Sequence, residues 1–191
     1  MTYPPVIVVN EEDIPIGLAM LAEVWDKGLY HRMVRIMAED GNGRILLQKR
    51  SANMTIFPGC WDNSAAGHVD EGMTYDSAAL QEVAEELGVE HHGRAEIGYY
   101  LYQGTHDGRI MNQFQKVYRI LLNHDPVTQD EHEVEELKWF TIEEVLALVR
   151  EHPVQVTPGL KGVMERYYQD KYENHRHQAT SQTQRPLLGI R

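Results

Sequence analysis

The sequence contains a single cysteine, Cys60, among its 191 residues. One thiol excludes an internal disulfide and a cysteine-rich zinc site, and it fits a reducing compartment. No run approaches the roughly 18 apolar residues of a membrane helix, so we expect no membrane association. The opening, MTYPPVIVVNEEDIPIG, lacks a basic region and an apolar core followed by small residues. We therefore expect no secretory signal and a cytoplasmic protein.

Basic residues are also scarce. Lys and Arg number 18 against 29 Asp and Glu, which gives a formal net charge of −11. A net negative surface repels a phosphate backbone, so we expect no nucleic-acid partner. A polyphosphate substrate would need local basic side chains or a bridging cation. Hydrophobic residues make up 42% and charged residues 25%, as in ordinary globular proteins. The length fits one domain with short extensions.

Apolar runs and turn residues divide the chain into short strands followed by helices. We predict an N-terminal hairpin, then strands joined by turns such as AEDGNG and THDGR, with the Asp-Gly pair typical of hairpins. The predicted segments are the hairpin at 5–20 and strands at 31–37, 44–50, 61–66, 95–102, 112–122 and 136–140.

Three helices are predicted from apolar spacing. The first covers 76–87 and ends at Gly88, the second follows Thr141 as its cap, and the third opens at Pro158. We expect residues 1–28 to be an extension, 29–172 the main domain, and the polar stretch 173–191 a disordered tail. This order predicts an α+β fold with a mixed sheet.

The first of these helices carries the chemistry. Glu82, Glu85 and Glu86 are spaced i, i+3 and i+4, so their carboxylates share one helical face. We expect an apolar face on the other side that packs on the sheet, made by Leu80, Val83, Ala84 and Leu87. Clustered carboxylates suit Mg²⁺ or Mn²⁺. A solvated acidic face explains the same three residues when they are taken alone.

The context of the helix resembles the Nudix box, G-x5-E-x7-R-E-U-x-E-E-x-G-U with U apolar. The matching residues are Gly67, Glu82, Val83, Glu85, Glu86, Gly88 and Val89. Two positions depart from the pattern: Met73 stands where the first Glu belongs, and Gln81 stands where the Arg belongs. In the family those two side chains form an ion pair between loop and helix. We interpret the departure as a lost brace that leaves the metal-binding carboxylates in place.

The resemblance covers about residues 5–172 and is strongest to the branch related to isopentenyl-diphosphate isomerase. It implies an α/β/α sandwich and hydrolysis of a diphosphate linkage in a nucleoside diphosphate derivative or similar small molecule. Isomerase chemistry itself is disfavoured, because Ala66 stands where that enzyme has a cysteine. We also place Met111 and Gln113 where it has two metal-binding glutamates; His31 and His68 match two of its histidines.

The resemblance implies roles for particular residues. Glu82, Glu85 and Glu86 would hold Mg²⁺ or Mn²⁺, with Glu85 as a second ligand or as the base that activates water. Arg50 and His68 would contact the substrate, although Arg50 is equally explained as a surface arginine. The acidic residues before the strand at 136–140, Glu133 among them, are an alternative source of the base or are simply solvated.

Two further alternatives stay open. The first is a catalytically silent module that binds a nucleotide or a protein partner, which the substitutions Met73 and Gln81 favour. The second is a residual isomerase-like activity. The sequence is also compatible with a homodimer.

Overall fold

The computed structural model describes residues 4–90, 93–122, 132–170 and 172, so the predicted tail at 173–191 lies outside it. Within these ranges no helix is long and apolar enough to cross a membrane. The elements, in chain order, are β1 Val6–Val9, β2 Pro15–Ala19, α1 Leu21–Lys27, β3 Tyr30–Glu39, β4 Arg44–Arg50, β5 Trp61–Asp62, β6 Ala65–His68, α2 Tyr75–Leu87, β7 Arg94–His106, β8 Arg109–Leu121, β9 Val134–Thr141, α3 Ile142–Glu151, a 3₁₀ turn Pro153–Gln155, α4 Pro158–Val163 and a π-helical turn Met164–Tyr168.

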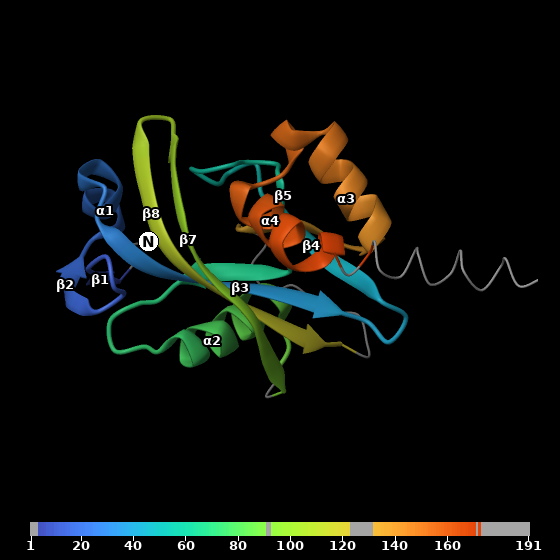
Figure 1. Ribbon diagram of the computed structural model, residues 1–191, viewed down its shortest axis with the longest axis horizontal. Coiled ribbons are helices and arrows are strands. Elements are labelled where there is room, and N and C mark those ends of the chain that lie inside the picture. The colour runs from blue at the N-terminus through green and yellow to red at the C-terminus, as the bar shows by residue number, and fades with distance from the viewer. Residues whose placement is uncertain (1–3, 91–92, 123–131, 171, 173–191) are drawn as a thin grey trace, which may run out of the picture.

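One mixed sheet organises these strands, and β3 lies at its centre. β3 pairs in parallel with β8 over ten residues and antiparallel with β1, β4 and β6. The β7–β8 hairpin extends one side of the sheet, and β4 continues the other side through β5 and β9. Helix α2 lies against one face, whereas α3 and α4 cover the other (Figure 1). The predicted α/β/α sandwich with a mixed sheet is therefore confirmed.

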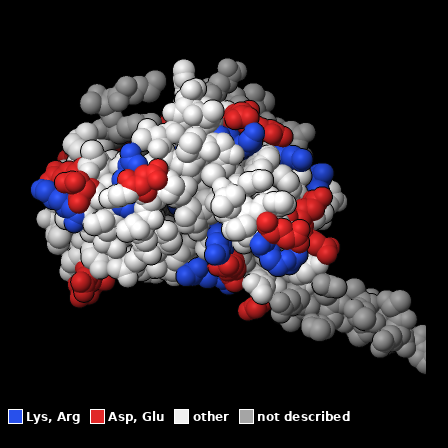
Figure 2. Space-filling model, turned by 90° about the horizontal axis from the view of Figure 1, so that it is seen from above, with Lys and Arg blue, Asp and Glu red and all other residues white. Residues whose placement is uncertain are grey.

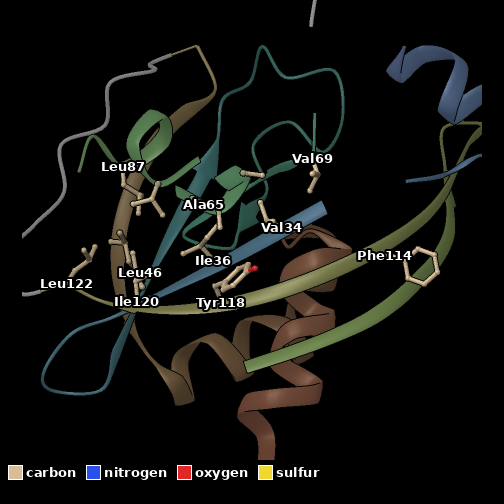
Figure 3. Close-up of a cluster of buried hydrophobic side chains, with 14 of the residues drawn as sticks. Val34, Ile36, Leu46, Ala65, Val69, Leu87, Phe114, Tyr118, Ile120 and Leu122 are labelled. Carbon is tan, nitrogen blue, oxygen red and sulfur yellow. The ribbon is translucent and has the colours of Figure 1, made fainter. Parts of the chain in front are cut away.

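The two faces of the sheet bury separate hydrophobic clusters. Along β3, Val34 and Ile36 point toward α2, whereas Met37 points toward α3 and α4. Figure 3 shows the larger cluster, in which Leu87 of α2 and Tyr118 of β8 lie among aliphatic side chains of the sheet. This strict alternation is what a strand covered on both faces requires.

Sequence signals located most helix ends. Thr74 caps α2 by accepting the Ser77 N–H, and Gly88 ends the helix at φ +66°. Thr141 and Thr157 likewise cap α3 and α4. The buried face of α2 differs from the prediction, however. Val83 and Leu87 are buried with Ala78 and Ala79, while Leu80 and Ala84 are only half-buried.

Two elements differ from the sequence prediction. Helix α1 was not predicted, because its seven residues follow directly on the apolar run of β2. The single strand predicted at 61–66 is divided into β5 and β6 at Ser64. The Ser64 hydroxyl accepts the Ala38 N–H at 2.7 Å and donates to the Leu46 carbonyl at 2.6 Å. Ser64 thus inserts between β3 and β4 and separates them.

Charged side chains of both signs are interspersed on the molecular surface. On the face that Figure 2 shows, blue and red atoms alternate, and no broad basic patch forms among the residues drawn in colour. On this face, an anionic ligand would have to be bound by local features of the fold.

The N-terminal hairpin is fastened to the domain by Asp13, in the turn between β1 and β2. One carboxylate oxygen accepts Arg32 Nε–H at 2.6 Å. The other oxygen accepts the hydroxyls of Tyr75 at 3.0 Å and Tyr99 at 2.9 Å. Asp13 also has a φ of +60°, which Asn and Asp tolerate better than other side chains.

We predict that Asp13→Asn lowers the free energy of unfolding by about 1–3 kcal/mol, because partly buried donors lose a charged acceptor while the φ of +60° stays accessible. Urea denaturation measures the change. Glu11→Gln, on the exposed turn nearby, is the control and should have no measurable effect. An unchanged free energy for Asp13→Asn contradicts the assigned fastening role.

Candidate metal and substrate site

The three glutamates of α2 share a face, as the spacing predicts, but their environments differ. Glu86 is 4% exposed, Glu82 is half-buried, and Glu85 is exposed. Because successive residues of a helix point in directions about 100° apart, Glu86 faces the sheet while Glu85 faces solvent. A purely solvated acidic face, the alternative interpretation, does not fit Glu86.

Glu86 reaches from α2 into the gap between β4 and β6. Its Oε2 accepts the Gln48 side-chain amide at 2.7 Å and the Ala66 backbone N–H at 2.9 Å. Burial nevertheless raises the pKa of Glu86 to about 8, against these two hydrogen bonds, which lower it. The carboxylate is thus held in place by both strands and is poorly compensated in charge.

Glu82 lies against Gly67 of β6. A Cβ atom at residue 67 would collide with the Glu82 carboxylate, so Glu82 could keep this position only beside glycine and would otherwise have to move. Burial raises the pKa of Glu82 well above its usual range, and the neighbouring charges of Glu86 and Glu85 raise it further. Successive residues of β6, Ala66 and Gly67, therefore contact the two inner glutamates of α2.

The donor chemistry of this cluster fits a divalent cation. No Lys or Arg forms an ion pair with Glu82, Glu85 or Glu86 in the part of the chain that the structure describes. Carboxylate oxygens are the ligands that Mg²⁺ and Mn²⁺ prefer. Their donor atoms are not gathered in advance, since the described residues contain no preformed group of three acidic, His or Cys ligands.

Glu133 contributes a further negative charge. Its backbone carbonyl accepts the Ser51 N–H at 2.8 Å, which fixes the start of β9 beside the end of β4. The charge of Glu133 raises the pKa of both Glu82 and Glu86, so it lies near the cluster. Glu135, by contrast, pairs with Lys49 at 2.8 Å on the surface.

Arg50 is not an ordinary surface arginine, because its side chain is only 15% exposed. Its Nη1 lies 3.5 Å from Asp62 Oδ2, and Nη1 of Arg35 lies 3.2 Å from Asp62 Oδ1. The Thr157 hydroxyl donates to the same Oδ1 at 2.6 Å, which joins this buried ion-pair cluster to the first turn of α4. Two guanidinium groups are thereby held within the fold of an otherwise acidic protein.

His68 lies on β6 directly after Gly67, and its Nε2 is buried without a hydrogen-bond partner. The ring stacks on His31 at a centroid distance of 5.3 Å and meets Trp25 edge-on at 6.3 Å. Burial, together with the charges of His31, Arg35 and Arg50, holds the pKa of His68 well below its usual range. The structure therefore brings His68 near His31, Arg35 and Arg50, while Gly67, the residue before it, lies against Glu82 of α2.

Amide side chains of β8 lie beside His31. Gln113 Nε2 lies 3.4 Å from His31 Nε2, and Gln115 donates to Gln113 at 2.9 Å. Gln113 is thus the residue of β8 that meets His31, and Gln115 is joined to Gln113; the correspondence of Met111 and Gln113 to the isomerase glutamates stays a prediction. Gln113 and Gln115 are neutral amides, so no carboxylate of β8 faces His31.

A cavity of about 510 Å³ lies between β7 and α4. Its lining includes Tyr102 of β7 and Lys161 and Arg166 of the last helical segment. Thr157, which binds Asp62, also lines it. This volume falls within the range of small-molecule sites.

Sequence reasoning missed several groups in this region. Asp62, Gln48, Arg35 and Trp25 come from four different elements. Their only signal was a polar or aromatic side chain in a strand or beside an apolar run. One departure from the box has a direct structural explanation. Met73 packs on the larger core, so an apolar contact replaces the ion pair that the family forms at this position.

The NUDIX domain family model matches residues 29–160, which include α2, β6 and the glutamate cluster. The chain belongs to the Nudix family. This confirms the resemblance drawn from the box residues and assigns the protein to the Nudix hydrolases.

The relatives include both isomerases and Nudix hydrolases, and a solved structure shares the fold. The chain is 36% identical over 164 residues to an isopentenyl-diphosphate Delta-isomerase of Nocardia farcinica, covering 84% of this chain and 93% of that protein. It is 34% identical over 133 residues to an uncharacterised Nudix hydrolase of Streptomyces coelicolor, covering 69% and 70%. The crystal structure of DR0079 from Deinococcus radiodurans shares the fold, with a TM-score of 0.73, 22% identity and coverage of 86% and 99%.

The raised pKa of Glu86 predicts a pH dependence of stability in the metal-free protein. A carboxyl group whose pKa rises on folding stabilises the fold at low pH, and this contribution is lost as pH rises through the folded value, here about 8. Glu86→Gln carries no such group. We therefore expect the melting temperature of the variant, relative to the unmodified protein, to increase between about pH 5 and pH 8.

Thermal unfolding in the presence of a chelator measures this difference, and Glu90→Gln, at an exposed position just after α2, is the control. If the melting temperatures of Glu86→Gln and the unmodified protein change with pH in the same way, the prediction is wrong. Glu86 would then either be exposed or have a counter-ion.

Proposed function

We propose that this Nudix hydrolase cleaves a diphosphate linkage in a nucleoside diphosphate derivative or a similar small molecule, with Mg²⁺ or Mn²⁺ as cofactor. The observation that carries the proposal is the acidic cluster of α2, which pairs with no basic side chain among the described residues, while Asp62 retains Arg35 and Arg50 on the sheet. The glutamates need a cation, and the arginines supply positive charge for phosphate oxygens. Its single cysteine supports a cytoplasmic location.

Glu82 and Glu86 would hold the cation, with Glu85 as a further ligand. When bound, the cation supplies positive charge that offsets the diphosphate and acidifies water at the site. Gln48 and the Ala66 N–H orient the Glu86 carboxylate from both sides, and Gly67 provides the space that Glu82 occupies. These contacts position Glu86 and Glu82, and the donor atoms would come together when the cation binds.

The base that takes a proton from water is assigned to Glu85, the one exposed carboxylate of the three. Glu133 is the second candidate, because its charge acts on the same cluster from the start of β9. Arg50 would contact the diphosphate, since its guanidinium is held in place by Asp62 and by the Ile56 carbonyl at 3.1 Å. The cavity between β7 and α4 would receive the group attached to the diphosphate.

Isomerase activity is disfavoured even though several relatives carry that name. Ala66 offers no thiol for proton transfer to carbon. Gln113 and Gln115 place amides, not carboxylates, beside His31. Hydrolysis at phosphorus needs neither group.

We predict that Glu86→Gln lowers the rate of Mg²⁺-dependent hydrolysis by at least about 10²-fold, the scale of losing a key electrostatic group. The amide keeps the shape of the side chain, so the fold should persist. A coupled assay of phosphate or nucleoside monophosphate release, run over a panel of diphosphate compounds, gives the rates. Glu90→Gln is again the control and should retain full activity.

Two outcomes would overturn the proposal. Unchanged turnover in Glu86→Gln would remove Glu86 from the metal site. Binding of the panel compounds without Mg²⁺-dependent or Mn²⁺-dependent product release would favour the silent binding module.

A further inference from the structure

The N-terminal hairpin leaves one edge of the sheet unpaired. Among the strands that the structure describes, β2 is the last of its sheet and pairs with β1 alone. Alternate residues of such a strand direct their N–H and C=O groups away from the sheet, where they offer hydrogen bonds to a further strand. No step of the proposed hydrolysis uses this edge.

The segment along this edge, residues 14–20, is apolar and exposed; we call it the hairpin edge. None of its seven residues is charged, although the chain carries a net charge of −11. All of them except Ala19 are exposed. The large apolar side chains are Ile14, Ile16, Leu18 and Met20. Edge strands are commonly protected from pairing by charged side chains, above all Lys, and this edge has none.

The hairpin edge is held in a fixed position. Asp13, the residue before it, is fastened to β3, α2 and β7 by the hydrogen bonds described above. Asn10 Oδ1 accepts the N–H of Glu12 at 3.0 Å and the N–H of Ile14 at 2.9 Å, which closes the turn. Because the edge is already ordered, pairing with another strand costs little further conformational entropy.

The fold of a single chain does not require glycine at residue 17. The φ of Gly17 is not in the left-handed region, and a Cβ atom there would meet nothing within 4 Å. The bulge nearby, between Val8 and Val9, would need a glycine only at a positive φ. Glycine weakens a strand, and it often marks a place where another backbone approaches closely. Gly17 therefore indicates contact with a second backbone.

A second copy of this chain matches the hairpin edge. In an antiparallel pair with a two-fold axis at Gly17, Ile16 lies opposite the partner's Leu18, and Ile14 lies opposite the partner's Met20. Each large apolar side chain then meets another, and no side chain separates the backbones at the axis. An uncharged edge gives a charged peptide no ion pair to form. Pro15, which lacks an N–H, lies at the start of β2, so Gly17 and its neighbours keep theirs.

The apolar area is sufficient for an interface between two copies. Judged from their exposed fractions, the four large side chains expose roughly 400 Å² in one chain and roughly 800 Å² in two. At the apolar share of about 65% that homodimer interfaces have, this corresponds to about 1,200 Å² of total buried surface. That value lies at the lower end of specific, stable interfaces.

We propose that the protein forms a two-fold dimer in which the hairpin edges of two chains pair antiparallel and join the two sheets. The partner is a second copy of this chain, and main-chain hydrogen bonds across the axis hold it. The inference does not depend on the proposed function, because no residue of the hairpin edge has a role in the proposed hydrolysis.

Sedimentation velocity of the full chain over a concentration series measures the pairing. Ile16→Lys places a charge opposite the partner's Leu18, and Ile16 is 65% exposed, so the single chain should keep its fold. Val154→Lys is the matched control, since Val154 is 85% exposed and follows α3, which lies on the far side of the molecule from β2 (Figure 1). Circular dichroism checks that both variants are folded.

We expect the unmodified chain and Val154→Lys to dimerise with equal dissociation constants. Ile16→Lys should raise the dissociation constant at least about tenfold, because the interface has no acidic group to pair with the new charge. Amide hydrogen exchange at residues 16–18 of the unmodified chain should slow as the dimer forms, since backbone pairing protects N–H groups.

Four results would overturn the inference. The first is a chain that stays monomeric at about 100 μM. The second is a dimer that Ile16→Lys leaves intact or that Val154→Lys weakens equally, and the third is dimerisation without slower exchange at residues 16–18. The fourth is a loss of dimer in Leu188→Asp as large as in Ile16→Lys, which would make the C-terminal segment of the partner the occupant of the edge.

Discussion

The structure around the site depends on one constraint, the insertion of the Glu86 carboxylate between β4 and β6. Gln48 and the Ala66 N–H hold it there, and no basic side chain in the described residues neutralises it. On the same helix, Glu82 lies against Gly67 and Glu85 is exposed. A fold that buries a carboxylate without a counter-ion loses stability unless the group takes up a proton or a cation binds. The proposed cation would therefore meet a need that the fold itself creates.

Opposite charges are kept apart by the strands of the sheet. The glutamates lie on α2, whereas Arg35 and Arg50 are retained by Asp62, which also fastens the first turn of α4 through Thr157. If the arginines paired directly with the glutamates, neither group would be available to a ligand. Asp62 thus preserves both the acidic and the basic part of the site.

Local signals predicted the helix and its carboxylates, because spacing of i, i+3 and i+4 determines a shared helical face. Caps such as Gly88 and Thr141 were predicted from residue type, because helix ends favour glycine at the C-terminus and threonine at the N-terminus. The unequal burial of Glu82, Glu85 and Glu86 could not be predicted, since it depends on how α2 packs against Gln48 of β4 and Ala66 of β6.

Strand register was the other limit of the sequence. His31 of β3 lies opposite Gln113 of β8, 82 positions later in the chain, in a parallel strand pair. If this register moved by two residues, the same side chains would still point to the same faces of the sheet. Alternation alone therefore does not identify the residue opposite His31. Gln115 was missed for that reason. The contribution of Trp25 depends on α1, a short helix that no periodic pattern distinguished from the preceding strand.

The central claim is that a divalent cation binds the carboxylates of α2 and not the histidines of β3 and β6. Anomalous diffraction from a crystal grown with Mn²⁺ tests it most directly. The account predicts a manganese peak in contact with the carboxylate oxygens of Glu82 and Glu86. A peak between His31 and His68, or no peak at α2 in a crystal saturated with Mn²⁺, would contradict it.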